Sequence, residues 1–285
     1  MPLVMMLVVS LAAMIVASVT LVCGYYLVVK TWPRGVGQAI VLPPAVPSLT
    51  KVNPRARVFK ILSYNVHGLP FFWKQNAKRA SELTRYLGSV TDTYDVVALQ
   101  EVFSKTFENT LRRFFRSRGW YVTFTPRALF PFLANSGLFL ASKYRLEDVR
   151  YDVFQPCCFT DCASTKGGLS ATVVKRNGQR HRVCTVHLQD STWPGSDGVQ
   201  KTQLRELSSK QKKGTVFVGD FNIRSEAMKR YAESLLGPAS FPSEPTFGNI
   251  VLDGAFGARV ASVQTLHPKF PCFVSDHQPI SVVLR

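Results

Sequence analysis

The sequence predicts an α/β fold in which β-sheets are covered by helices on their outer faces. Short runs with the character of β-strands recur along most of the chain, and segments with helical periodicity lie between them. Of the 285 residues, 46% are hydrophobic and 19% are charged, which suits a packed core and excludes a disordered chain. Strands interleaved with helices favour layered packing of this kind.

The expected elements follow from local pattern. Runs rich in β-branched and aromatic residues predict strands at Val58–Val66, Asp95–Leu99, Trp120–Thr125, Gly137–Ser142, Leu169–Lys175, Arg182–His187, Thr215–Val218 and Ile280–Leu284. Apolar residues spaced three and four apart predict helices at Ala77–Leu87, Lys105–Arg116, Gln200–Lys212 and Glu226–Leu236.

The N-terminal segment, residues 1–29, predicts a transmembrane anchor. It contains no charged side chain, and its apolar run Leu3–Val29 would reach roughly 40 Å as a helix, which is enough to cross a bilayer. A cleavable signal peptide is the alternative, although its apolar core is normally about 7–15 residues behind a basic segment. No Lys or Arg precedes this run.

The residues after this run predict the orientation and the domain boundaries. Lys30 and Arg34 follow it directly, so the positive-inside rule predicts a single-pass membrane protein whose C-terminal body is cytosolic. Several prolines in residues 30–57 indicate a stalk. The remaining residues, 58–285, have the length of one domain, and we expect them to carry the function.

The chain is strongly basic, with a formal net charge of +17. Such a surface attracts polyanions, so the expected partners are an anionic membrane surface, including a membrane lipid as substrate, or nucleic acid. A solubilising surface without a specific partner is the other interpretation. Composition does not choose among them.

The cysteines indicate no zinc site. Cys157, Cys158 and Cys162 form a cluster, but no second Cys/His pair follows at the spacing of a zinc finger. The number of cysteines after the predicted anchor is odd, which favours a reducing compartment and free thiols. Acylation of the cluster is a further alternative.

Polar side chains stand where the predicted strands end. They are Asn65, His67, Gln100, Glu101, His187, Asp220, Asn222, Asp276 and His277. Strand ends gather at one edge of a sheet, so these residues are expected to meet in one cleft.

Each motif also has a simpler interpretation. Glu101 directly follows a buried-looking run, where a carboxylate can bind a hard cation, but it could be an ordinary surface acid. Asp220 and Asn222 would point to the same side of an extended chain, or form a capped turn. His277 beside Asp276 suggests acid–base chemistry, whereas His187 could be a core histidine.

Taken in order, seven segments resemble the successive motifs of the endonuclease/exonuclease/phosphatase superfamily. They read LSYNVHGLP, DVVALQEVF, NSGLFLASKY, TVHLQ, VGDFNI, VLDGAF and SDHQPI, and the resemblance covers Val58–Arg285. It implies a four-layered α/β sandwich, two packed β-sheets flanked by helices, and a Mg²⁺-dependent hydrolase acting on phosphate esters.

The resemblance also implies a metal site. Glu101 would be the principal Mg²⁺ ligand, Asn65 would lie close by on metal or phosphate, and Asp276 would support the site. Carboxylate and amide oxygens are the ligands that this hard cation prefers.

The acid–base residues follow from the same resemblance. Asp220 would orient the nucleophilic water, and Asn222 would bind a phosphoryl oxygen. His187 would stabilise developing negative charge, and His277 would be the general base. Asp253 would hold His277, although the LDGAFG segment lacks the bulky apolar residues that usually follow this aspartate.

The loop Asp161–Gly167 resembles one that neutral sphingomyelinases carry before a strand, in which Asp161 and Lys166 would serve substrate binding. Lys166 could contact the phosphate as a point charge, and a surface turn is the simpler interpretation. The expected reaction is hydrolysis of sphingomyelin to ceramide and phosphocholine. A phosphoinositide phosphatase, a nuclease, a lysophospholipid phospholipase C and a non-enzymatic scaffold remain alternatives.

Overall fold

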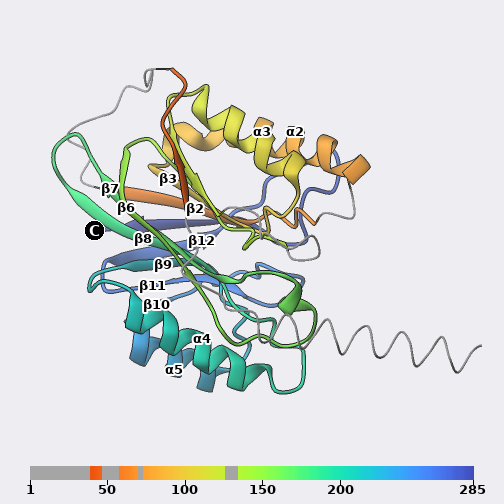
Figure 1. Cartoon of the computed structure of the whole chain (residues 1–285), viewed down its shortest axis with the longest axis vertical. Coiled ribbons are helices and arrows are strands. Elements are labelled where there is room, and N and C mark those ends of the chain that lie inside the picture. The colour runs from red at the N-terminus through yellow and green to blue at the C-terminus, as the bar shows by residue number, and fades with distance from the viewer. Residues whose placement is uncertain (1–38, 47–57, 70–72, 126–133) are drawn as a thin grey trace, which may run out of the picture. The chain divides into compact units, whose positions relative to one another are not determined.

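The computed structural model describes residues 39–46, 58–69, 73–125 and 134–285. Two β-sheets pack face to face, and two helices cover the outer face of each, which makes four layers (Figure 1). The predicted α/β sandwich is therefore confirmed for these residues.

One sheet has seven described strands in the order β1-β4-β5-β3-β2-β13-β12. Its strands are β1 (Ile40–Leu42), β2 (Phe59–Asn65), β3 (Val96–Gln100), β4 (Tyr121–Phe124), β5 (Phe139–Ser142), β12 (Val260–Thr265) and β13 (Ile280–Leu284). β2 and β3 run parallel, so their carboxyl ends, Asn65 and Gln100, lie side by side.

The other sheet has six described strands in the order β10-β11-β9-β8-β7-β6. Its strands are β6 (Arg145–Val153), β7 (Gly167–Val174), β8 (Arg180–His187), β9 (Val216–Asp220), β10 (Ala239–Ser240) and β11 (Asp253–Phe256). β8 and β9 are its parallel pair, and they end together at His187 and Asp220.

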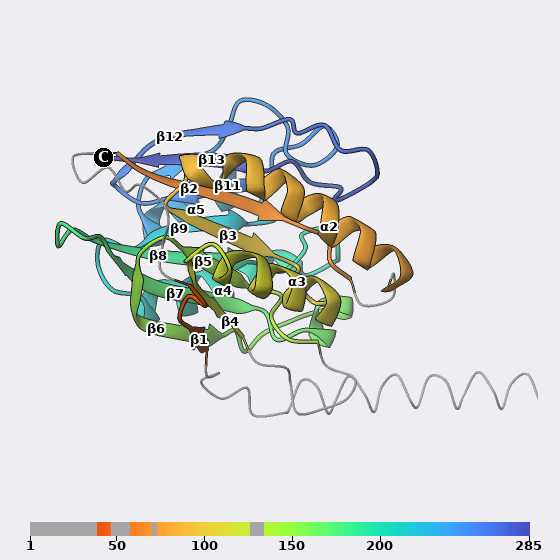
Figure 2. The same cartoon turned by 90° about the horizontal axis from the view of Figure 1, so that it is seen from above.

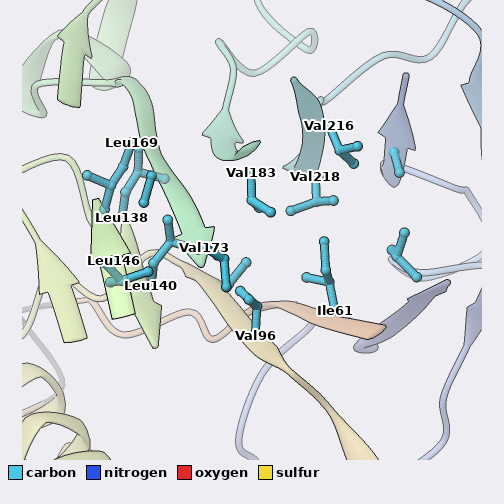
Figure 3. Close-up of a cluster of buried hydrophobic side chains, with 14 of the residues drawn as sticks. Ile61, Val96, Leu138, Leu140, Leu146, Leu169, Val173, Val183, Val216 and Val218 are labelled. Atoms are coloured by element: carbon cyan, nitrogen blue, oxygen red, sulfur yellow. The ribbon is translucent and has the colours of Figure 1, made fainter. Parts of the chain in front are cut away.

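The two sheets share a core of aliphatic side chains, which project from both inner faces (Figure 3). Ile61 and Val96 come from the central strands of one sheet, and Val183 and Val218 come from those of the other. All four are almost fully buried. Because side chains alternate along a strand, the residues between them face the helices instead.

The helices complete the outer layers (Figure 2). α2 (Trp73–Val90) and α3 (Lys105–Arg116) pack on the seven-stranded sheet, where Leu83 and Phe115 are fully buried. α4 (Ser196–Lys210) and α5 (Glu226–Leu236) pack on the six-stranded sheet. Short 3₁₀ helices, η2 (Thr91–Thr93) and η3 (Phe159–Ala163), lie in connections.

All the expected strands and helices are confirmed. α3, α5 and β13 match their predicted bounds, and the bounds of the others differ by a few residues. Five strands were not predicted: β1, β6, β10, β11 and β12. Most lie at or next to a sheet edge, where one face is solvated and the apolar pattern is weak. β6, for example, carries Arg145, Glu147 and Arg150.

The membrane prediction needs correction. Of the helices that the structure describes, none is both long enough and apolar enough to cross a bilayer, which overturns the single-pass assignment and the orientation derived from it. The proposed anchor, residues 1–29, lies outside the described residues. Within the proposed stalk, 30–57, β1 pairs with β4 and so forms part of a sheet.

The cysteine cluster also differs from expectation. Cys157 and Cys162, expected as thiols, form a disulfide whose Cα atoms are 5.2 Å apart. Within the described residues Cys158, Cys184 and Cys272 are free. The disulfide closes a short loop around η3, directly before Lys166.

One prediction concerns His181, a buried histidine on β8 whose ring stacks on Phe59 at 4.0 Å. Burial, aided by the charges of Arg259 and Lys175, lowers its pKa to about 4. The unfolded chain therefore binds more protons between pH 4 and 6.5, so stability falls as the pH falls through this range. We expect His181→Leu to lessen this loss by about 1–3 kcal/mol. Urea unfolding of both proteins at pH 7 and 4.5 measures it, and parallel losses would contradict the prediction.

Candidate active site

The site forms where the parallel strand pairs of both sheets end. Asn65 and Gln100 end neighbouring strands of one sheet, and His187 and Asp220 end neighbouring strands of the other. Gln100 joins the sheets, because its Nε2 donates to Thr185 Oγ1 at 2.9 Å. The expected meeting of these strand ends is found.

Asn65 links carboxylates that belong to different sheets. Its Nδ2 donates to Glu101 Oε1 at 2.9 Å and to Asp220 Oδ2 at 3.1 Å. Its Oδ1 accepts from the backbone N–H of His67 at 3.1 Å. Asn65 is fully buried, so the amide holds both acids in fixed positions.

The backbone of Glu101 is held in an unusual conformation, with φ of 59°. Such a conformation costs an ordinary residue energy and persists only where neighbours impose it. Gly68 and Gly137 are those neighbours: an added Cβ would lie 2.6 Å from Glu101 O and 2.9 Å from Glu101 Cα, respectively. The two glycines therefore let the chain close around Glu101 and aim its carboxylate into the site.

His277 lies between two aspartates. Its Nδ1 is 2.8 Å from Asp253 Oδ2, and its Nε2 is 3.7 Å from Asp220 Oδ2. Asp253 and Asp220 face each other across β11 and β9. Burial opposes the charged ring, but Asp253 and then Asp220 outweigh it and raise the pKa of His277 to about 10. For the carboxyl of Asp220 burial acts in the opposite direction and raises the pKa to about 7.

The loop before β7 brings Lys166 into the same site. Its Nζ lies 2.8 Å from Asp161 Oδ2, 2.7 Å from Leu188 O and 3.2 Å from His187 Nε2. Lys166 is only 4% exposed, which does not fit a surface turn. An ammonium can only donate, so His187 Nε2 accepts. Burial, Lys166 and His277 together hold the pKa of His187 well below its usual value, and the ring is neutral.

Asn222 and Asp276 complete the expected set. The backbone N–H of Asn222 donates to Asp220 Oδ1 at 2.9 Å, and its Nδ2 donates to Leu188 O at 3.2 Å. Asp276 Oδ2 is 3.2 Å from His67 Nδ1. Every side chain that the sequence nominated therefore lies in one contiguous group.

His67 is one of the strand-end residues of the sequence for which no role was predicted. Its Nδ1 lies between Asp276 Oδ2 and Glu101 Oε2, the latter at 3.7 Å. Its backbone has a left-handed φ of 46° where the chain leaves β2. An unusual backbone angle cannot be read from a histidine in sequence, so only the motif position could have suggested it.

Arg79 on α2 was missed entirely. It is buried, and it joins the loop after β2 to the loop before β13: Nη2 donates to His67 O at 2.7 Å and to Val274 O at 2.6 Å. Ser275 strengthens the same junction, because its Oγ donates to Asn65 O at 2.6 Å. The exposed ring of Phe273 covers the guanidinium at 5.3 Å. Arg79 thus fixes the loop that follows Asn65 and the loop that carries His277.

The donor set fits a divalent cation. Within the described residues, Glu101, His187 and Asp220 offer ligand atoms within 4.8 Å of one another, as do Asp220, Asp253 and His277. Several carboxylates this close repel each other unless positive charge is present. Oxygen ligands predominate near Glu101 and Asn65, which suits a hard cation.

The comparisons agree with the fold. The model of the Endonuclease/Exonuclease/phosphatase family matches residues 62–277. Members of this superfamily are hydrolases, mostly phosphodiesterases, and they use divalent metals. Among curated proteins, none matches this sequence.

Solved structures with similar folds include a toxin, a sphingomyelinase and a protein bound to single-stranded DNA. Beta toxin from Staphylococcus aureus, as a double mutant with bound magnesium ions, aligns with a TM-score of 0.65 at 18% identity, covering 79% of this chain and 99% of its own. Sphingomyelinase C from Streptomyces griseocarneus gives 0.59 at 18%, covering 80% and 99%. TDP2 from D. rerio with a single-strand DNA product gives 0.60 at 20%, also covering 80% and 99%. At these identities the likeness shows the fold alone.

A prediction follows for Arg79. We expect Arg79→Met to remove donors from three carbonyl oxygens, to lower the free energy of unfolding by about 3 kcal/mol, and to lower activity more than 10-fold. Arg85→Met is the control, because Arg85 lies on the same helix but is exposed. Urea unfolding and turnover should separate the two variants. Equal stability and turnover in the two variants would show that the hydrogen bonds of Arg79 between the loops do not support the site.

Proposed function

We propose that this chain, which belongs to the endonuclease/exonuclease/phosphatase family, is a divalent-metal-dependent phosphodiesterase that hydrolyses sphingomyelin to ceramide and phosphocholine. The site contains the groups that phosphodiester hydrolysis requires: acids for a cation, an oriented imidazole and a donor for phosphoryl oxygen. The substrate class is the finer part of the proposal, and one observation supports it most.

That observation is the position of Lys166. It reaches the acidic group from a loop with the Asp-x₄-Lys-Gly spacing that resembles sphingomyelinases. Its three N–H donors are directed at Asp161, Leu188 and His187, so none is spare. The contact with His187 is the longest. We infer that a phosphate oxygen replaces His187 as the acceptor, which frees His187 Nε2 to interact with the substrate.

His277 and Asp220 would act on the water. Asp253 holds the Nδ1 side of the His277 ring, which leaves Nε2 directed toward Asp220. A water between these two groups would be oriented for attack on phosphorus, and His277 would take its proton as general base. Asn222 lies beside Asp220, where it could contact a phosphoryl oxygen.

Glu101 and Asn65 would hold the metal, which we propose to be Mg²⁺, with Asp276 and His67 beside them. When bound, this cation would neutralise charge on the phosphodiester and offset the carboxylates that keep the pKa of His277 high. The chain contributes the positions of these ligands through the turn at Glu101 and the two glycines that permit it.

Product analysis tests the substrate. The full chain would be incubated with sphingomyelin, a choline lysophospholipid, a phosphoinositide and single-stranded DNA, each with Mg²⁺ and with a chelator. We expect phosphocholine from sphingomyelin, only with Mg²⁺. Preferred release of inorganic phosphate or of nucleotides would replace the proposed substrate with a phosphoinositide or a nucleic acid.

Glu101→Gln tests the metal site. The amide keeps the shape of the side chain but loses its charge, so we expect turnover to fall at least about 10²-fold while the melting temperature stays near that of the wild type. Mg²⁺ titration by calorimetry should show weaker binding. Glu82→Gln is the matched control, because Glu82 lies on α2 outside the site and pairs there with Arg85. Unchanged Mg²⁺ affinity in Glu101→Gln would exclude this residue as a ligand.

Lys166→Met tests whether the position of Lys166 matters for sphingomyelin hydrolysis. Methionine fills the same space without the ammonium, so we expect kcat on sphingomyelin to fall about 10²-fold. Lys210→Met, on α4, is the control: Lys210 contacts Glu206 and Val153 O but none of the candidate site residues, so this change should leave kcat unchanged. A rate for Lys166→Met within twofold of the wild type would remove the main support for this substrate.

A further inference from the structure

A cluster of positively charged side chains lies in the second half of α3, away from the acidic site. Asn109, Arg112, Arg113 and Arg116 lie on one side of this helix and line a shallow, solvent-open cavity of about 310 Å³. Their spacing of three and four residues brings the side chains next to one another. A volume of this size accommodates a small ligand.

The charges around this cavity are not balanced. Glu108 Oε1 is 3.1 Å from Arg112 Nη1. Within the described part of the chain, no carboxylate pairs with Arg113 or Arg116. Like charges at these spacings destabilise a helix. An anion in the cavity would remove this repulsion.

Two of the guanidinium groups are held in place by contacts that leave donors available. Arg112 stacks over the ring of Phe124, with 4.7 Å from Cζ to the centroid. Arg116 donates from Nε to Pro43 O at 2.9 Å, and its own carbonyl accepts from Ala45 N–H at 3.0 Å. Groups that are already fixed lose little freedom on binding, which favours affinity.

The helix dipole explains only part of this arrangement. Cations in the last turn interact favourably with the free carbonyl groups there, and this would account for Arg113 and Arg116. It explains neither Arg112 and Asn109, one turn earlier, nor the cavity that the four side chains share.

We propose that this cavity binds a phosphate-bearing anion at a site separate from the catalytic one. The planar fork of arginine matches phosphate oxygens in pairs, and the amide of Asn109 adds a donor. The start of α3 lies near the catalytic residues, because Ser104 N–H donates to Gly68 O, whereas the arginines occupy its last two turns. The phosphate group could belong to a soluble molecule or to a lipid headgroup.

Calorimetry of the full chain with inorganic pyrophosphate, in chelator, tests the site. We expect Arg113→Gln to weaken binding about 10-fold, and Arg113→Gln/Arg116→Gln to weaken it further. Arg113 is the first choice because it is exposed. Arg230→Gln, exposed on α5, is the matched control and should bind as the wild type does.

Vesicles separate the two sources of phosphate. Phosphatidylcholine vesicles with and without phosphatidic acid would be sedimented with wild type, the double variant and the control. Binding that needs phosphatidic acid and the two arginines indicates a lipid headgroup, and arginine-dependent binding of pyrophosphate alone indicates a soluble ligand. Absence of binding to both probes, equal binding by the double variant, or an equal loss in the control would overturn the proposal.

Discussion

The side-chain amide of Asn65 donates to Glu101, which follows a strand of the same sheet, and to Asp220, which belongs to the opposite sheet. The rest of the site depends on this bridge. Two buried acids from separate layers come together only if the sheets pack face to face with the parallel strand pairs ending at one edge. The aliphatic core between the sheets therefore sets the distance at which the catalytic groups meet (Figure 3). A change in that packing would therefore shift the catalytic groups relative to one another even if each side chain stayed intact.

Around the bridge, the loops are held by groups that do no chemistry themselves. Gly68 and Gly137 permit the turn at Glu101, and Arg79 ties the loop of His67 to that of Val274. The unusual φ angles at His67, Glu101 and Asn222 all fall at this edge. Such angles store energy, and buried hydrogen bonds to the neighbouring carbonyls are what sustain them.

This division explains what the sequence could predict. Central strands and strand-end polar residues follow from period and position, so Glu101, His187 and Asp220 were nominated together with the fold. Edge strands such as β6 and β12 were not, because their exposed faces dilute the apolar pattern. Arg79 carries no local signal, since a buried arginine on an amphipathic helix reads as a surface charge. Its partners lie as far away as Val274 and are defined only by tertiary contacts.

The charge of the chain has to be considered in two parts. Five of its 18 acidic residues gather in the site: Asp161, Glu101, Asp220, Asp253 and Asp276. Lys166 and His277, whose pKa is raised, supply positive charge against them. The basicity that suggested a polyanionic partner therefore arises elsewhere, in places such as the arginine-lined side of α3. An anionic substrate enters an acidic site only if bound cations and Lys166 offset the carboxylates, so attraction at long range and stabilisation at the reacting phosphorus are separate tasks. Because different residues perform them, net charge alone could not identify the substrate.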